Sequence, residues 1–250
     1  MPVGLLFLSL GVLTVLTLVG LPLLRTGWSQ RSVPELALAA FFIVGGTVTF
    51  GFDLAAREFV GDSLEWQTRF RTVSYLGARV PAVAIALFTW KVFRPGQRWA
   101  AMLFTLITTV MLVLSLNHLL VGRATPGSGP AFWIGVLTTV VALGWAMTDS
   151  FAYYRSSVRR LALGLSTAVV TNRFLLWSIW SGAAMLILVG KVSSILLFDV
   201  DGPFTPARGV VTLFQSTIGL VCVTALALAF YPPAAYKRWI ESRSPATLAA

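Results

Sequence analysis

Six ionisable or amide residues inside long apolar stretches of this 250-residue sequence are candidates for a functional role. They are Asp53, Arg79, Asn117, His118, Lys191 and Gln215. Charged groups are costly to hold in hydrocarbon, so residues of this kind mark ligand or ion sites by default. Two cations against one carboxylate would suit a small anionic ligand. We therefore predict that these six residues line a ligand-binding cavity.

Each of these side chains also has a purely structural explanation. Asp53 and Lys191 lie near the ends of their stretches, where a polar side chain can reach the lipid headgroups. Arg79 lies roughly 10 Å into its stretch at 1.5 Å per residue, and an ion pair with Asp53 would stabilise it there. A ligand cavity and a set of structural contacts both stay open at this point.

The sequence argues against enzymatic chemistry. The chain has one histidine and one cysteine, Cys222, too few for a bis-histidine haem site, a disulfide or a zinc hydrolase site. No apolar stretch has a carboxylate at its centre, as a proton relay would need, and the last stretch lacks the lysine of a retinal protein. Phosphate-binding glycine loops and nucleophile elbows are absent. We therefore expect a protein that is not an enzyme, with no catalytic residue, metal or cofactor.

The composition indicates a membrane protein. Hydrophobic residues make up 57% of the chain and charged residues 11%, whereas soluble domains carry about 25% charged residues. The net charge is +10. In a soluble protein this excess would suggest nucleic acid, but here we assign it to basic loops that contact anionic lipid headgroups, and we expect no nucleic acid partner.

Seven stretches are long enough to cross a bilayer, since a spanning helix needs about 20 apolar residues. They cover residues 3–24, 36–56, 72–93, 99–121, 131–151, 174–198 and 210–231. The uncharged N-terminal stretch lacks the basic start of a signal peptide, so we interpret it as a retained span. Short turns join most of the stretches. The predicted fold is an all-α integral membrane protein, a seven-transmembrane-helix antiparallel bundle over residues 1–232.

Lysine and arginine are concentrated at one set of span ends, which orients the chain. The positive-inside rule places these ends in the cytoplasm. The N-terminus is then outside and the C-terminus inside, in a multi-pass protein of the bacterial inner membrane. On this topology the polar residues inside the spans lie in the outer part of the bundle.

The predicted cytoplasmic face carries its own candidate residues. Asn172 and Arg173 open the sixth span, where an asparagine can cap the free N–H groups of a helix. Arg159 and Arg160 belong to a basic rim that anchors to lipid or contacts a cytoplasmic partner. Residues 233–250 form a cytoplasmic amphipathic helix and tail, and the helix is expected to lie along the interface.

Small residues and a proline predict how the second and third spans pack. Gly45, Gly46 and Gly51 are small enough to let helix backbones approach closely. Pro81, two residues after Arg79, predicts a kink in the third span, and a kink there would open space for a ligand.

Four segments carry a resemblance. They are Arg159–Leu165, Val169–Trp177, Pro34–Phe42 and Phe230–Trp239. In these segments the chain resembles an uncharacterised family of bacterial seven-span membrane proteins. Members carry an Asp-Pro pair ahead of Asn-Arg, where this chain has Thr167 and Ala168. The resemblance implies the seven-span topology and brings no activity with it.

These observations favour a seven-helix receptor or sensor that binds a small ligand, with anions as the favoured class, in the outer half of the bundle. The polar residues within the spans and a basic cytoplasmic face without an enzymatic domain are the two reasons. One alternative is a small transporter or lipid-handling carrier, and another is an accessory subunit of a membrane complex. The expected partners are anionic lipid headgroups, a small-molecule ligand, and a membrane or cytoplasmic protein.

Overall fold

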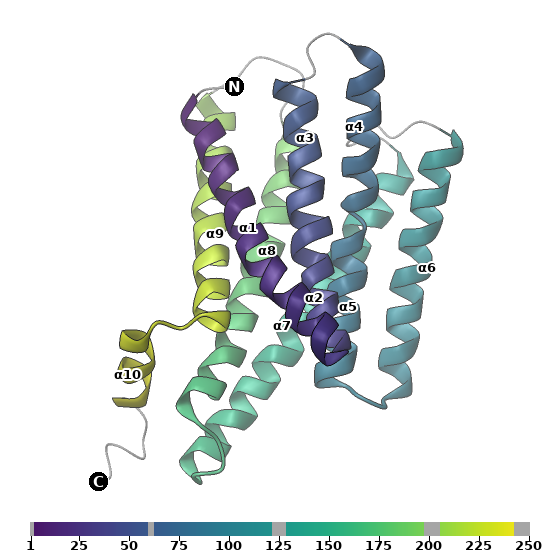
Figure 1. The fold of residues 1–250 in the computed structure, drawn as a ribbon. Coiled ribbons are helices and arrows are strands. Elements are labelled where there is room, and N and C mark those ends of the chain that lie inside the picture. The colour runs from purple at the N-terminus through teal and green to yellow at the C-terminus, as the bar shows by residue number, and fades with distance from the viewer. Residues whose placement is uncertain (1–2, 60–62, 122–128, 198–205, 243–250) are drawn as a thin grey trace. The chain divides into compact units, whose positions relative to one another are not determined.

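The computed structural model describes residues 3–59, 63–121, 129–197 and 206–242 (Figure 1). These residues form helices and short turns, with no strand among them. The predicted end of the sixth span at Phe198 and residues 243–250 of the predicted tail lie outside the described residues. In chain order the elements are α1 (Val3–Gln30), α2 (Val33–Ala40), the π-helix η1 (Phe41–Val48), α3 (Thr49–Glu58), α4 (Leu64–Gly77), α5 (Val80–Phe93), α6 (Arg98–Val121), α7 (Pro130–Ala162), α8 (Ala168–Leu197), α9 (Pro206–Phe230) and α10 (Ala234–Ser242).

Seven helical stretches within the described residues are long and apolar enough to cross a membrane. This confirms the seven spans predicted from hydropathy and indicates a multi-pass membrane protein. Large apolar side chains also face outward. On α6, Met102 is 72% exposed and Leu120 is 84% exposed. Apolar surface of this extent is unfavourable in water and suits contact with lipid.

The chain divides into two compact units, with the boundary inside α7. The first unit comprises Met1–Ala124 and Gly129–Ala142, and the second comprises Thr125–Ser128 and Leu143–Ala250. Within the first unit, Figure 1 shows the α1–α2 turn and the α5–α6 turn at the same end. Within the second, the α7–α8 turn and α10 lie toward one end.

The second span contains a π-helical segment between α2 and α3. Thr47 and Thr49 each donate a side-chain hydrogen bond to the carbonyl five residues earlier, on Phe42 and Val44, at 3.4 and 2.9 Å. Wider turns of this kind are rare and frequently occur at functional sites. Gly45 in this segment lies against Pro81 of α5, with which any Cβ would overlap. The close approach predicted for this glycine is confirmed.

Two residues in turn conformation, 78 and 79, interrupt the helix of the third span. α4 ends at Gly77 and α5 begins at Val80, so Arg79 stands in the break as the N-cap residue of α5. Pro81 falls in the first turn of α5, where its missing N–H costs nothing because that position has no helical partner. α4 also begins at Leu64, earlier than the predicted start at residue 72, because helical hydrogen bonding continues beyond the apolar segment.

The helix α7 is longer than its predicted span. α7 continues to Ala162, whereas the prediction ended at residue 151. It ends in a Schellman turn, in which Leu165 N–H bonds to the Arg160 carbonyl at 2.8 Å and Gly164 N–H to the Leu161 carbonyl at 3.0 Å. Gly164 has φ +70°, a conformation that favours glycine at this position. Hydropathy predicts where the chain leaves the hydrocarbon layer. The helix itself ends where its last carbonyl groups accept hydrogen bonds from residues beyond the helix.

Candidate functional site

The Arg79 side chain is stacked on aromatic rings. Its guanidinium carbon lies 4.3 Å from the centre of the Tyr75 ring. The Tyr75 ring in turn lies 4.1 Å from the His118 imidazole, with 31° between the two planes. We call these three residues the arginine stack. A cation over an aromatic face is held by the electrostatic attraction of the ring, which suits a charge in apolar surroundings.

The helix ends position the members of the stack. Tyr75 lies one helical turn before Arg79, so the two side chains fall on the same side of the third span. The break after Gly77 leaves Arg79 at the N-terminus of α5. His118 comes from the last turn of α6. Three elements therefore contribute to the stack.

A fourth helix, α7, lies against the Arg79 guanidinium at Gly135. A Cβ placed on Gly135 of α7 would overlap with Arg79 Nη1 and would lie 3.0 Å from the guanidinium carbon. The Arg79 side chain therefore occupies space that a larger residue at position 135 would fill. Gly135 itself is buried. Its missing side chain is what allows the cation to lie against α7.

Two nitrogens of the stack are buried and make no hydrogen bond within the described part of the chain. They are Arg79 Nε and His118 Nδ1. A buried polar atom without a partner costs about 1–3 kcal/mol, and more when the group is charged, so nearly all such atoms have a partner. The guanidinium edge that contains Nε matches a carboxylate in spacing and charge. The arrangement is therefore suited to binding a small anion.

The stack lies at a defined depth along the first unit. α5 has 14 residues, so Arg79 is roughly 20 Å along the helix axis from the α5–α6 turn. His118 lies at the opposite end of α6 from that turn. Because the hydrocarbon layer is about 30 Å thick, the stack falls in the third of the span farthest from this turn.

Two other predicted residues belong to the first unit but not to the stack. Asn117 is exposed on α6 beside His118. Asp53 is half-buried on α3 and takes part in an interaction of its own. The structure pairs Arg79 with Tyr75 rather than with Asp53.

Lys191 and Gln215 belong to the second unit. Lys191 is exposed on α8. Gln215 on α9 packs against Gly190, where a Cβ would lie 3.2 Å from the Gln215 amide nitrogen. Gln215 therefore faces the residue before Lys191 on α8.

An open groove of about 470 Å³ also lies in the second unit, among α7, α8 and α9. Its lining is mostly apolar and includes Leu175, Ile179, Leu186 and Val221. None of the six residues predicted to bind a ligand lines this groove.

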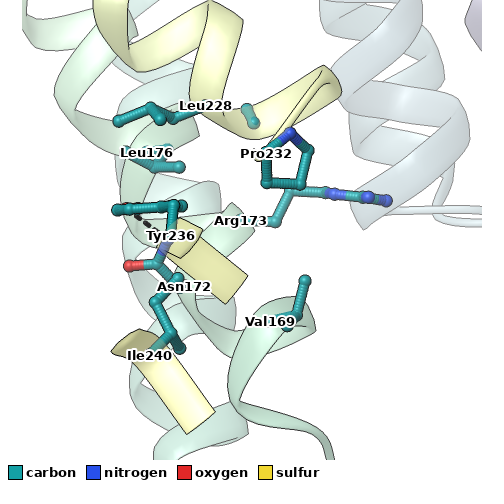
Figure 2. Close-up of a pocket in the computed structure, with 9 residues that line it drawn as sticks. Val169, Asn172, Arg173, Leu176, Leu228, Pro232, Tyr236 and Ile240 are labelled. Atoms are coloured by element: carbon teal, nitrogen blue, oxygen red, sulfur yellow. Dashed lines mark hydrogen bonds between the residues drawn. The ribbon is translucent and has the colours of Figure 1, made fainter. Parts of the chain in front are cut away.

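The predicted capping role of Asn172 is wrong. α8 begins at Ala168, and Thr167 Oγ1 accepts the Val170 N–H at 3.3 Å at its start. Asn172 lies further inside the helix, where its amide nitrogen donates a 2.9 Å hydrogen bond to the Tyr236 hydroxyl (Figure 2). The boundary error has a simple cause, since the first turns of α8 are too polar to be counted in an apolar span.

The remaining residues of the predicted cytoplasmic face are basic and exposed. Arg159 and Arg160 lie in the last turn of α7. Arg173 is exposed on α8, and Figure 2 shows its side chain pointing away from the Asn172–Tyr236 pair.

Three residues with a place in these sites were missed by sequence reasoning. Tyr75 carried a signal, since an aromatic residue four positions before an arginine meets it on a helix. Gly135 carried none, because its role depends on which helix packs beside Arg79. Asp149 on α7 is 5% exposed and accepts a 2.9 Å hydrogen bond from Trp145 Nε1. It lies two residues before the predicted span end at residue 151 and was not among the predicted site residues.

The geometry above is the basis for any functional assignment. Comparison with protein-family models, curated proteins and solved structures finds no match to this chain. The resemblance to a bacterial seven-span family therefore stays a prediction, and the function is argued from the chain itself.

Proposed function

We propose that this protein is a membrane receptor or sensor that binds a small organic anion, such as a carboxylate, at the arginine stack. The observation that carries the proposal is the buried Arg79 Nε, which has no hydrogen-bond partner among the described residues. His118 beside it has a buried ring nitrogen in the same situation. A small anion that accepts a hydrogen bond from Arg79 Nε would satisfy this buried group.

The physical argument concerns charge in hydrocarbon. An arginine at the very centre of a spanning helix costs about 2.5–3.5 kcal/mol on insertion scales, which is an upper limit for Arg79 in the outer part of its span. Stacking of the guanidinium on Tyr75 offsets about 0.5–2 kcal/mol of this insertion cost. A bound carboxylate would neutralise the charge and supply the missing acceptor. In the proposed topology, with the N-terminus outside a bacterial inner membrane, the stack lies in the outer third and receives its ligand from outside.

The test uses pairs of small probes that differ in charge alone. Monocarboxylates and their uncharged amides are added to the purified full chain, and the melting temperature is measured. Ligands that bind the folded state raise this temperature in proportion to the logarithm of their concentration. We expect the carboxylates to raise it and the amides to leave it unchanged.

Variants at position 79 assign the response to the stack. Arg79→Gln removes the charge and should abolish the rise. Arg79→Lys keeps the charge but loses the planar edge, and should weaken binding about tenfold. A full carboxylate-dependent rise in melting temperature in Arg79→Gln would contradict the proposal.

A second candidate function, a carrier of the same anion, is supported by the irregular backbone next to Arg79. Transporter sites are commonly built where spanning helices are interrupted. Here the break between α4 and α5 and the π-helix η1 are in contact through Gly45 and Pro81. Counterflow of a radiolabelled carboxylate in liposomes separates the candidates. Uptake that is lost in Arg79→Gln favours the carrier, and binding without uptake favours the receptor.

A further inference from the structure

The short helix α10 is amphipathic, and its apolar edge is already used inside the protein. Tyr236 and Ile240, one turn apart, are half-buried and line one depression with Asn172 and Leu176 of α8 (Figure 2). Asn172 donates its hydrogen bond to the Tyr236 hydroxyl in this contact. The depression between the elements leaves no space for a water molecule. An interfacial helix ordinarily buries its apolar edge among the lipid acyl chains. The apolar edge of α10 is instead packed against the protein.

The rest of α10 presents two cations and an indole. Lys237 and Arg238 are exposed. Trp239 is 49% exposed, and its ring stacks on Tyr236 at 5.8 Å with 20° between the planes. Glu241 is also exposed and interacts within the chain. Tryptophan favours the headgroup level of a bilayer, and cations are attracted to anionic lipid.

A neighbouring helix adds positive charge next to α10. Arg173 follows Asn172 directly on α8, is exposed, and points away from the Asn172–Tyr236 pair (Figure 2). The Asn172–Tyr236 hydrogen bond joins α10 to α8 at the residue before Arg173, so the joined parts of the two helices carry three exposed cations. The charge of this surface is complementary to a phosphodiester.

We propose that α10 and Arg173 form a binding surface for the headgroup of an acidic phospholipid. Lys237, Arg238 and Arg173 supply the attraction, and Trp239 anchors the helix at headgroup depth. Because Tyr236 and Ile240 are packed on the protein, acyl burial contributes little. Binding is therefore electrostatic, depends on the charge of the lipid, and weakens as ionic strength rises.

The test measures lipid retention by the purified full chain. Phosphatidylglycerol and phosphatidylcholine with identical acyl chains are offered in detergent, and bound lipid is counted by native mass spectrometry. A cation near an anionic surface contributes about a fivefold factor to binding. We expect phosphatidylglycerol to be retained over phosphatidylcholine. Lys237→Gln combined with Arg238→Gln should lower this retention about fivefold per cation removed, and Arg173→Gln should give about a fivefold loss.

The matched control removes the same charge elsewhere. Arg94→Gln combined with Arg98→Gln changes two basic residues at the α5–α6 turn in the first unit. Loss of retention in this control should be clearly smaller than in Lys237→Gln combined with Arg238→Gln. Equal losses in the two double variants, or equal retention of the two lipids by the wild type, would overturn the proposal. Displacement of the lipid by millimolar inorganic phosphate would assign the surface to free phosphate instead, and would also overturn it.

Discussion

At the scale of single residues, Gly135 decides how close the Arg79 guanidinium lies to α7. The glycine offers no Cβ, and the Arg79 side chain fills the space that one would occupy. The far end of a flexible arginine can move aside, so a small substitution at position 135 should displace the cation without unfolding the protein. Gly135 is therefore a positioning residue of the proposed anion site.

Gly135→Ala is expected to weaken carboxylate binding while leaving the fold intact. Hydrogen bonds to charged groups contribute about 1.5–3 kcal/mol, so loss of the guanidinium geometry should weaken binding about tenfold or more. The carboxylate-dependent rise in melting temperature measures the effect.

The control lies in the same helix. A Cβ on Gly144 would lie 3.9 Å from the Met185 sulfur, an ordinary contact. Gly144→Ala should therefore keep the full carboxylate response. An undiminished response in Gly135→Ala would show that the position of the guanidinium does not matter for binding.

At the scale of elements, two irregular segments meet in the first unit. Gly45 of η1 lies against Pro81 of α5, and Gly77 at the end of α4 lies against Thr49 Oγ1 at the start of α3. The π-helix and the helix break thus fit together through glycines. α5 begins next to this contact, and Arg79 is its N-cap residue.

Gly45→Ala is expected to destabilise the protein. Its new methyl group would overlap the Pro81 ring, which cannot rotate away, and overpacking of this kind typically costs about 1–3 kcal/mol. A lower melting temperature of the purified chain would be the direct readout.

Gly51→Ala serves as the comparison in the same span. The nearest atom to its Cβ would be a Leu13 methyl at 3.9 Å, and alanine is favoured over glycine in a helix by about 1 kcal/mol. This variant should melt at or above the wild-type temperature. If Gly45→Ala melts as high as Gly51→Ala, the fit between η1 and α5 is looser than the distances indicate.

At the scale of the whole molecule, the distribution of charge predicts the orientation. Basic residues at the α5–α6 turn and around the α1–α2 turn lie at the same end of the first unit (Figure 1). In the second unit, the basic end of α7 and the cations of α10 lie toward one end. The positive-inside rule assigns such ends to the cytoplasm.

A fusion after Ala250 tests this orientation. Green fluorescent protein attached there should fluoresce in a bacterial host, and alkaline phosphatase at the same position should stay inactive. The opposite pair of results would place α10 outside the cell. The arginine stack would then open toward the cytoplasm, and its ligand would be an intracellular anion.

The sequence alone determined the number and approximate position of the spans, because hydropathy is a local property of about 20 consecutive residues. It also singled out Arg79 and His118, since charged residues are rare in hydrocarbon. Helix ends were less well predicted, because α7 and α8 continue beyond the apolar segments that define the spans.

Only the tertiary structure decided which side chains meet. Tyr75 between Arg79 and His118, Gly135 against the guanidinium, and Tyr236 on Asn172 are contacts between helices. Such contacts depend on how helices are rotated and displaced relative to one another. Periodicity within one helix does not contain that information, because each helix can present the same face to several neighbours.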